Sequence, residues 1–192
     1  MLLCLALLGA AAALDTARIA ALRETPRLRD PAPVGAGAPQ YLDGEDWVVS
    51  SADGTVGPFA GDVPGDLITD LQLAGVINDP IFNQTWLDWQ YAGLAAPLWD
   101  SQNFTYTKIF DADAALLAPG TTVQLTFDGN KMAADVALNG VALGFTNDMF
   151  LRTAFDASAA LKPSGNVLTV TFTTSKDVRN EAGRWPAVRA RG

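Results

Sequence analysis

The residues that most often carry acid–base or nucleophilic chemistry are scarce in this chain of 192 residues. It contains no histidine and a single cysteine, Cys4. This composition excludes histidine-based triads, histidine-ligated zinc and clusters of cysteine ligands. Asp111 and Asp113 form an isolated pair rather than the longer Asp-x-Asp-x-Asp loop of a calcium site. We therefore predict neither a metal nor a cofactor.

Carboxylates are numerous, but their sequence contexts indicate turns rather than catalysis. Asp79 and Asp88 are the pair that could be imagined as acid and base. Asp79, however, precedes a proline in a corner, where an aspartate usually accepts hydrogen bonds from backbone amides. The glutamates lie outside any recognisable catalytic motif: Glu24, Glu45 and Glu181. No residue is therefore assigned a catalytic role.

An aromatic cluster between residues 82 and 106 offers another chemistry, the binding of sugars. Flat rings stack on pyranose faces, and neighbouring Asp and Asn side chains can bond to hydroxyl groups. The candidate sugar-binding residues are Trp86, Trp89 and Trp99. The alternative is that these rings fill the core, which is the better prediction for most of them because large aromatic side chains are usually buried.

Two sequons and an apolar start indicate the secretory pathway. Asn83 and Asn103 each begin an Asn-x-Thr acceptor tripeptide for N-glycosylation. Residues 1–13 combine a run of Leu and Ala with small residues at a suitable cleavage site, as in a signal peptide, although the usual basic residue near the start is missing. A misassigned start of the chain is the alternative. We expect a secreted, lysosome-like or vacuolar protein.

The charge balance restricts the partners. The chain has 21 acidic and 13 basic residues, and residues 41–175 alone hold 16 acidic and four basic ones. Such a surface repels phosphate backbones and anionic membranes. We expect neither nucleic acid nor a membrane as a partner.

The elements that would position these residues are strands. Apolar and polar residues alternate in 122–127 and in 168–172, as in strands with one buried face. Residues 135–138 and 141–145 flank Asn139-Gly140, a dipeptide suited to a type I′ turn, so a hairpin is predicted there. The pattern predicts an all-β, antiparallel sandwich.

Further elements are predicted earlier in the chain. A first strand is expected at 47–49, and another where Phe104, Tyr106 and Phe110 alternate with residues 105, 107 and 108. Residues 61–66 predict a rigid corner in which Gly65 takes a positive φ. A short helix is expected after it, ending at Gly75.

The chain therefore divides into four parts. Residues 1–13 are the predicted signal peptide, and residues 14–40 form a flexible linker rich in proline and glycine. Residues 41–175 form the sandwich, and residues 176–192 are a basic tail.

An ordered series of motifs resembles the N-terminal domain of β-mannosidase-like enzymes of glycoside hydrolase family 2. The series runs through most of the chain from Tyr41 onward: Trp47, Val63-Pro64-Gly65, Thr69-Asp70-Leu71, Ala74-Gly75-Val76-Ile77, Asn78-Asp79-Pro80, Trp89, Trp99, Tyr106, Phe110, Phe127-Asp128-Gly129, Leu138-Asn139-Gly140, Asn147-Asp148-Met149-Phe150 and Phe155-Asp156. The resemblance implies a jelly-roll sandwich of the galactose-binding type that packs against a catalytic barrel.

The resemblance also implies what the rest of such an enzyme contains. Family members continue into an immunoglobulin-like domain and a barrel with two catalytic glutamates, which a retaining mechanism needs. We therefore expect a truncated enzyme whose complete form hydrolyses terminal β-mannose, and we expect this chain alone to be inactive. The alternatives are a free-standing carbohydrate-binding module and a structural fragment without activity.

Overall fold

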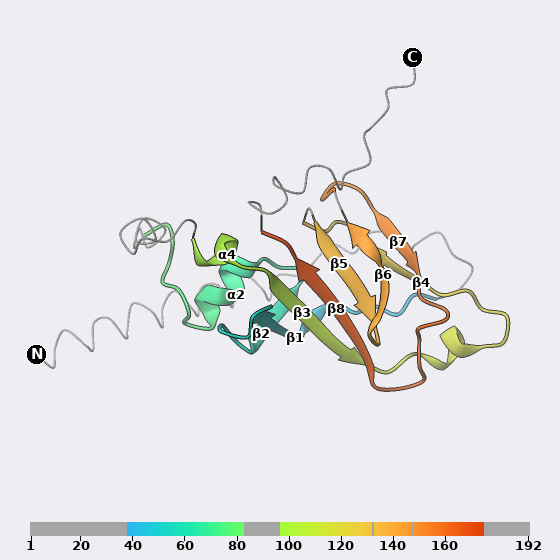
Figure 1. Cartoon of the computed structure of the whole chain (residues 1–192). Helices are drawn as coiled ribbons and strands as arrows, with labels where there is room; N and C mark the ends of the chain where they lie inside the picture. Colours follow the sequence, from blue (N-terminus) through green and yellow to red (C-terminus); the bar gives the residue numbers. More distant parts are fainter. Residues whose placement is uncertain (1–37, 83–96, 132, 147, 175–192) are drawn as a thin grey trace, which may run out of the picture.

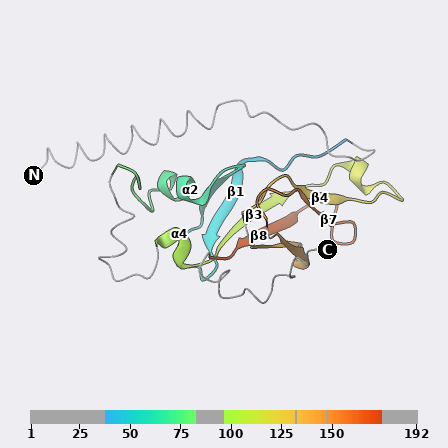
Figure 2. The same cartoon turned by 90° about the horizontal axis from the view of Figure 1, so that it is seen from above.

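The computed structural model describes residues 38–82, 97–131, 133–146 and 148–174. They form a sandwich of antiparallel strands, which confirms the predicted all-β fold (Figures 1 and 2). The predicted signal peptide, the basic tail and all but the last three residues of the predicted linker lie outside the described residues. No helix in the described part is long and apolar enough to cross a bilayer.

The larger sheet has six strands in the order β2-β1-β3-β8-β5-β6, and the smaller sheet pairs β4 with β7. In chain order the elements are β1 (Gly44–Ser51), β2 (Phe59–Val63), α2 (Leu67–Leu73), α4 (Leu98–Ser101), β3 (Phe104–Phe110), the 3-10 turn η1 (Ala114–Leu117), β4 (Gln124–Phe127), β5 (Ala134–Leu138), β6 (Val141–Thr146), β7 (Thr153–Asp156) and β8 (Asn166–Phe172).

The core lies on the inner face of the larger sheet. Four strands contribute one continuous row across it, because Val49 pairs with Tyr106, Tyr106 with Val170, and Val170 with Val136. All four side chains are buried. Fully burying an aliphatic side chain contributes about 1.5–3 kcal/mol, so rows of this kind supply much of the driving force for folding.

The predicted hairpin is confirmed at β5 and β6. Asn139 and Gly140 have φ values of 54° and 80°, as a type I′ turn requires. Asn139 also ties the turn to β8, because its Oδ1 accepts from the amide of Val167 at 2.9 Å and its Nδ2 donates to Oδ1 of the buried Asn166 at 2.9 Å.

The predicted corner at residues 61–66 is partly wrong. Residues 61–63 belong to β2, and Gly65 does not have a positive φ. Gly65 is instead needed for close packing, since an added Cβ would lie 2.3 Å from the carbonyl oxygen of Asp62. The corner ends at Asp66, whose Oδ1 accepts from the amide of Thr69 at 3.0 Å and caps α2. The helix ends as predicted, with Gly75 at φ 71°.

The smaller sheet packs against the end of the larger sheet formed by β6 (Figure 1). Phe127 and Phe155 pair across β4 and β7 in an edge-to-face arrangement with ring centroids 6.2 Å apart. Gly144 of β6 lets the layers approach, because a Cβ there would lie 2.6 Å from the ring of Phe155. The second layer is therefore small, and besides this close contact its residues Leu125, Phe127 and Phe155 pack against the core.

Candidate functional site

The structure separates the aromatic cluster into core and surface. Phe104 and Tyr106 are buried on the inner face, and Trp99 of α4 is half-buried and packs against the core. Phe82, by contrast, is 75% exposed. Trp86 and Trp89 lie outside the described residues, so their role as sugar-binding residues stays a prediction. Core packing is thus the main role of the described aromatic residues.

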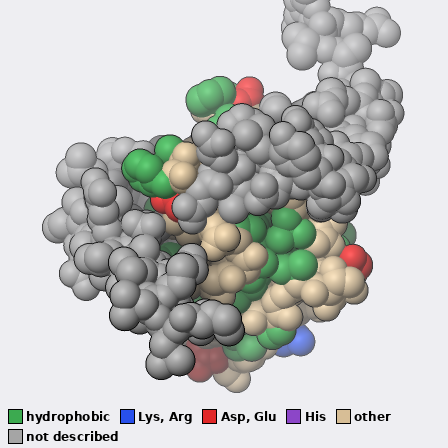
Figure 3. Space-filling model, turned by 90° about the vertical axis from the view of Figure 1, so that its left-hand side faces the viewer, with side chains coloured by type: hydrophobic (Ala, Val, Ile, Leu, Met, Phe, Trp, Pro, Cys, Tyr) green, Lys and Arg blue, Asp and Glu red, His purple; other side chains and the backbone are tan. Residues whose placement is uncertain are grey.

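The side of the molecule with α2 and α4 is largely uncharged where the described residues are visible. Figure 3 shows hydrophobic and neutral polar atoms over most of this surface, with small charged areas toward its rim. The exposed apolar residues that follow α2 in the chain include Val76, Ile81 and Phe82.

Asp79 shapes the segment that carries Ile81 and Phe82. Its Oδ1 accepts from the amides of Ile81 at 2.8 Å and of Phe82 at 3.0 Å. The hydrogen bond from Phe82 is the largest of the effects that lower the pKa of this carboxyl, because it stabilises the ionised form. Asp79 is therefore a turn residue, as predicted, while Asp88 lies outside the described residues.

Several other aspartates do the same structural work. Those whose side chains accept an amide two or three residues further on are Asp53, Asp66, Asp148 and Asp156. Asp111 instead joins two distant segments, because it accepts from the amide of Gly165. In Asp53 the hydroxyl of Ser51 is the largest cause of a lowered pKa, and in Asp156 it is the hydroxyl of Ser158. The acidic character of the domain thus comes in large part from carboxylates that fix turns.

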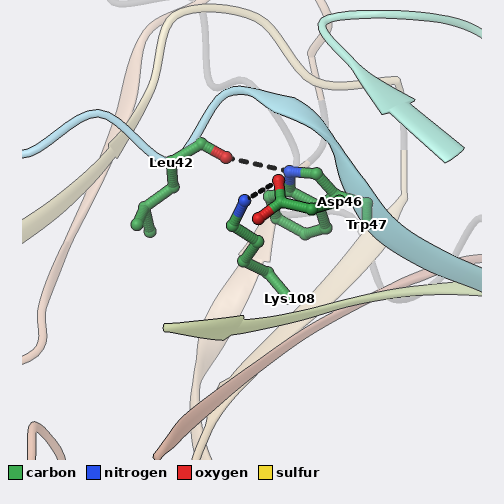
Figure 4. Close-up of polar contacts among 4 residues, drawn as sticks. All are labelled: Leu42, Asp46, Trp47 and Lys108. Atoms are coloured by element: carbon green, nitrogen blue, oxygen red, sulfur yellow. Dashed lines mark hydrogen bonds and ion pairs between the residues drawn. The ribbon is translucent and has the colours of Figure 1, made fainter. Parts of the chain in front are cut away.

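Lys108 is a buried cation, which corrects the prediction for its strand. The predicted alternation sets it among the polar positions, yet it lies on the inner face with Phe104 and Tyr106 and is 5% exposed. Its Nζ forms an ion pair with Asp46, as Figure 4 shows. A strict period of two from Phe104 would have identified it, since residue 108 is an even number of positions away.

The surroundings of Lys108 explain how the charge is tolerated. Its Nζ lies 6.0 Å from the ring centroid of Trp47, at the outer limit of a cation–π contact, and Nε1 of that tryptophan donates to the carbonyl of Leu42 at 2.9 Å (Figure 4). The hydrogen bond from Lys108 is the main cause that lowers the pKa of Asp46. The cluster fixes the entry of the chain into β1, because it joins Leu42, Asp46 and Trp47 to β3.

A second buried polar group joins α2 to the larger sheet. Asp70 is fully buried, and its Oδ2 accepts from the hydroxyl of Tyr106 at 2.7 Å while its Oδ1 accepts from the amide of Asp62 at 3.3 Å. Removing a partner from such a buried group costs about 1–3 kcal/mol. Asp70 therefore fixes the position of α2 against β2 and β3. In the sequence it is one aspartate among many, with no signal that it is buried.

Asn103 of the second sequon stands at the start of β3. Its Oδ1 accepts from the amide of Thr174 at 3.0 Å, and its backbone carbonyl accepts from the amide of Ala52 at 2.8 Å. A glycan would be attached to Nδ2, the other side-chain atom, and would leave the bond to Thr174 in place. Asn83, of the first sequon, lies outside the described residues.

Many polar contacts among the described residues join one element of the sandwich to another. Within the described ranges no group of three or more His, Cys, Asp or Glu is placed to hold a metal ion. The ion pairs and buried carboxylates join neighbouring elements to one another.

Comparison with known proteins finds the same domain in glycoside hydrolases. A family model described as "Glycosyl hydrolase 2 galactose-binding domain-like" matches residues 47–190. Beta-mannosidase A of Emericella nidulans is 32% identical over 145 residues, which cover 73% of this chain and 14% of that protein. Beta-mannosidase B of Thermothelomyces thermophilus is 30% identical over 130 residues, with 67% and 14% covered.

A solved structure agrees with these matches. The beta-D-mannosidase of Dictyoglomus thermophilum superposes with a TM-score of 0.63 at 25% identity, over 79% of this chain and 17% of that chain. The chain therefore spans less than a fifth of the length of these relatives.

Proposed function

Because this chain belongs to the galactose-binding-like domain family of glycoside hydrolase family 2, we propose that it is the non-catalytic N-terminal domain of a β-mannosidase-like exoglycosidase. The complete enzyme would hydrolyse terminal β-mannose from glycans. Its two catalytic carboxylates would belong to a barrel outside this chain, and the sandwich would pack against that barrel.

The observation that carries the proposal is the agreement among relatives. Two fungal proteins named β-mannosidases are 30% and 32% identical to this chain over aligned segments of 130 and 145 residues, and a bacterial β-D-mannosidase shares its fold. The use of aspartates in turns and ion pairs is consistent with a scaffold role, since Asp46, Asp79 and Asp128 have structural partners.

One experiment tests the non-catalytic role and a second tests the sugar. The purified 192-residue chain is expected to give no turnover of an aryl β-mannoside above the buffer blank, and sustained turnover that copurifies with the chain would contradict the proposal.

The transcript downstream of Gly192 is then read, and its full-length product is assayed on aryl β-mannoside, β-galactoside and β-glucuronide. We expect kcat/KM to be at least about tenfold higher for the mannoside, a difference of roughly 1.4 kcal/mol in transition-state binding. Preference for another sugar would retain the domain family and reject the mannosidase assignment.

We also propose that the protein follows the secretory route and carries a glycan on Asn103. Expression in a eukaryotic secretory host should give a product that shifts on treatment with an N-glycanase. Thr105→Val removes the sequon at nearly constant volume and should abolish the part of the shift due to Asn103, whereas Thr105→Ser keeps the sequon and should retain it. An identical shift in both variants would show that Asn103 is not modified.

A further inference from the structure

The turn between β5 and β6 contains the only Asn-Gly dipeptide of the sequence, Asn139-Gly140. Asparagine followed by glycine is especially prone to deamidation, because glycine has no side chain that hinders its amide nitrogen as a nucleophile. That nitrogen attacks Cγ of the asparagine and ammonia leaves, which forms a cyclic succinimide. Water then opens the ring to an aspartate or an isoaspartate. The overall reaction consumes one water and releases one ammonia.

The fold holds the side chain of Asn139 away from this reaction. Its Nδ2 donates to the carbonyl of Ala160 at 2.7 Å and to Oδ1 of Asn166 at 2.9 Å, which uses both hydrogens. Its Oδ1 accepts from the amide of Val167 at 2.9 Å. We name this set of contacts the Asn139 junction, and it lies where β5 ends beside the start of β8 (Figure 1).

Ring closure needs a different conformation at residue 139. The succinimide ring includes the Cα–C and Cα–Cβ bonds of the asparagine, so both ψ and χ1 must reach the values of a nearly planar ring. In the folded chain φ of Asn139 is 54°, in the left-handed region, and the hydrogen bonds of the junction hold χ1. The turn must therefore open locally before the nitrogen of Gly140 can reach Cγ.

Asn166 determines which kind of group the junction accepts at position 139. Its Nδ2 donates to the carbonyl of Lys162 at 2.7 Å, and its Oδ1 accepts from the amide of Lys162 at 2.8 Å as well as from Asn139. Asn166 is fully buried, and turning its amide over would set donor against donor at Lys162. The side chain at position 139 must therefore be a donor toward both Asn166 and Ala160.

The product of deamidation does not meet this requirement. An ionised carboxylate accepts hydrogen bonds and donates none, so at position 139 it would face two acceptors, Oδ1 of Asn166 and the carbonyl of Ala160. An isoaspartate would in addition lengthen the main chain by one methylene group within the turn. Leaving buried acceptors without a donor destabilises the folded state. The junction therefore fits the amide and not the acid.

We propose that Asn139 is a deamidation site that folding protects, and that its modification prevents the chain from rebuilding the Asn139 junction. The product would accumulate in chains that have opened, and it would convert a reversible opening into an irreversible loss of the native state. The proposal does not depend on the enzyme to which the domain belongs or on the sugar that this enzyme cleaves.

The rate of deamidation in the full chain tests the protection. The native chain and the chain unfolded in guanidinium chloride are incubated at the same mildly alkaline pH, and the peptides that contain Asn139 and Asn78 are quantified by mass spectrometry. Asn78 is the matched reference, because it is exposed in the folded chain and precedes Asp79 rather than a glycine. We expect the rate at Asn139 relative to Asn78 to be at least about tenfold lower in the native chain than in the unfolded chain. Equal ratios in the two states, or no faster reaction at Asn139 than at Asn78 after unfolding, would overturn the proposal.

Refolding tests whether the modified side chain is excluded from the native state. After partial modification in denaturant the chain is diluted into buffer, and native molecules are separated from the rest by size-exclusion chromatography. The native fraction should contain at least about fivefold less of the Asn139 product than the remainder, whereas the Asn78 product should be distributed evenly. An even distribution at both sites would overturn the proposal.

A direct substitution gives the same answer without refolding. Asn139→Asp supplies the acid, and Asn78→Asp is its control at an exposed position. Asn139→Asp should lower the equilibrium constant for folding by at least about tenfold, or leave the chain unfolded, while Asn78→Asp should change it by less than about twofold. Urea denaturation that finds Asn139→Asp as stable as the wild-type chain would reject the exclusion of the acid, and with it the proposal.

Discussion

The two layers of the sandwich differ in how completely their side chains are buried. On the inner face of the larger sheet Val49, Val136 and Leu168 are at most 1% exposed. In the smaller sheet every residue of β4 and β7 is half-buried or exposed. Two-stranded sheets are marginally stable by themselves. The larger sheet therefore carries most of the stability, and the smaller one is held by its contact with β6 and by the half-buried side chains that pack against the core.

The largest expected effect comes from the same substitution made once in each layer. Leu168→Ala empties a buried position in the middle of the larger sheet and should lower the free energy of unfolding by about 2–5 kcal/mol. Leu125→Ala removes the same atoms from a half-buried position in β4 and should cost about 1 kcal/mol. Urea denaturation of both variants in the full chain measures the difference.

The comparison of layers would fail if Leu125→Ala proved as destabilising as Leu168→Ala. Such a result would mean that the smaller sheet is buried by residues beyond those described. Ile109→Ala is a suitable control, because Ile109 lies on the outer face, is 66% exposed and should change the free energy of unfolding by less than about 0.5 kcal/mol.

An intermediate effect is expected at the contact between the layers. Gly144→Ala adds a Cβ that would lie 2.6 Å from the ring of Phe155, at a residue whose φ is 155°. Overpacking of this kind costs about 1–3 kcal/mol, so the variant should unfold at a lower urea concentration.

The clash itself is tested by making room for the new methyl group. Phe155→Leu should cost clearly less in the Gly144→Ala background than in the wild-type chain, because it removes the ring atoms that the new methyl group would meet. If the two substitutions were additive, backbone strain at Gly144 rather than contact between layers would explain the loss.

The sequence predicted the fold where the pattern was local. The alternation in β8 and the Asn139-Gly140 turn depend on neighbours in the chain, and the structure confirms them. The strand predicted at 122–127 is confirmed only for Gln124–Phe127, where Thr126 is half-buried like Leu125 and Phe127. In the corner before α2 the positive φ of Gly65 was wrong, because close approach to Asp62, a contact made after folding, explains the glycine better. The alternation of apolar residues and the residue types of a turn can be read from neighbouring positions, whereas close packing involves residues that meet only in the folded chain.

The candidate site was less predictable than the fold. Phe82 and Trp99 belong to one aromatic cluster in the sequence, but the first is exposed and the second packs against the core. Asp70 is buried only because α2 folds onto β2 and β3, which no sequence window reveals. A charged side chain is expected on the solvent-exposed face of a strand, but Lys108 is buried. Its partner Asp46 is 62 residues away in the sequence, so the pairing could not be predicted from neighbouring residues.

The smallest expected effect concerns that ion pair, which joins β1 to β3 in the larger sheet. Lys108 lowers the pKa of Asp46 below its ordinary value of 3.8, so the folded chain keeps this carboxylate ionised to lower pH than the unfolded chain does. The resulting stability is fully present above that value and is lost as the pH falls through the lowered pKa. Because the carboxylate is 71% exposed, we expect Asp46→Asn to lower the free energy of unfolding by about 0.5 kcal/mol or less at pH 7.

The pH dependence distinguishes this ion pair from a purely steric role of Asp46. The difference between Asp46→Asn and the wild-type chain should be largest at pH 7 and should shrink as the pH is lowered below about 4, measured by urea denaturation at matched ionic strength. In a Lys108→Met background the same substitution should have nearly the same small effect at every pH, because the cation that shifts the pKa is gone. A difference that stays constant with pH while Lys108 is present would show that Asp46 supports the sheet through packing rather than charge, and that the buried lysine depends on some other group.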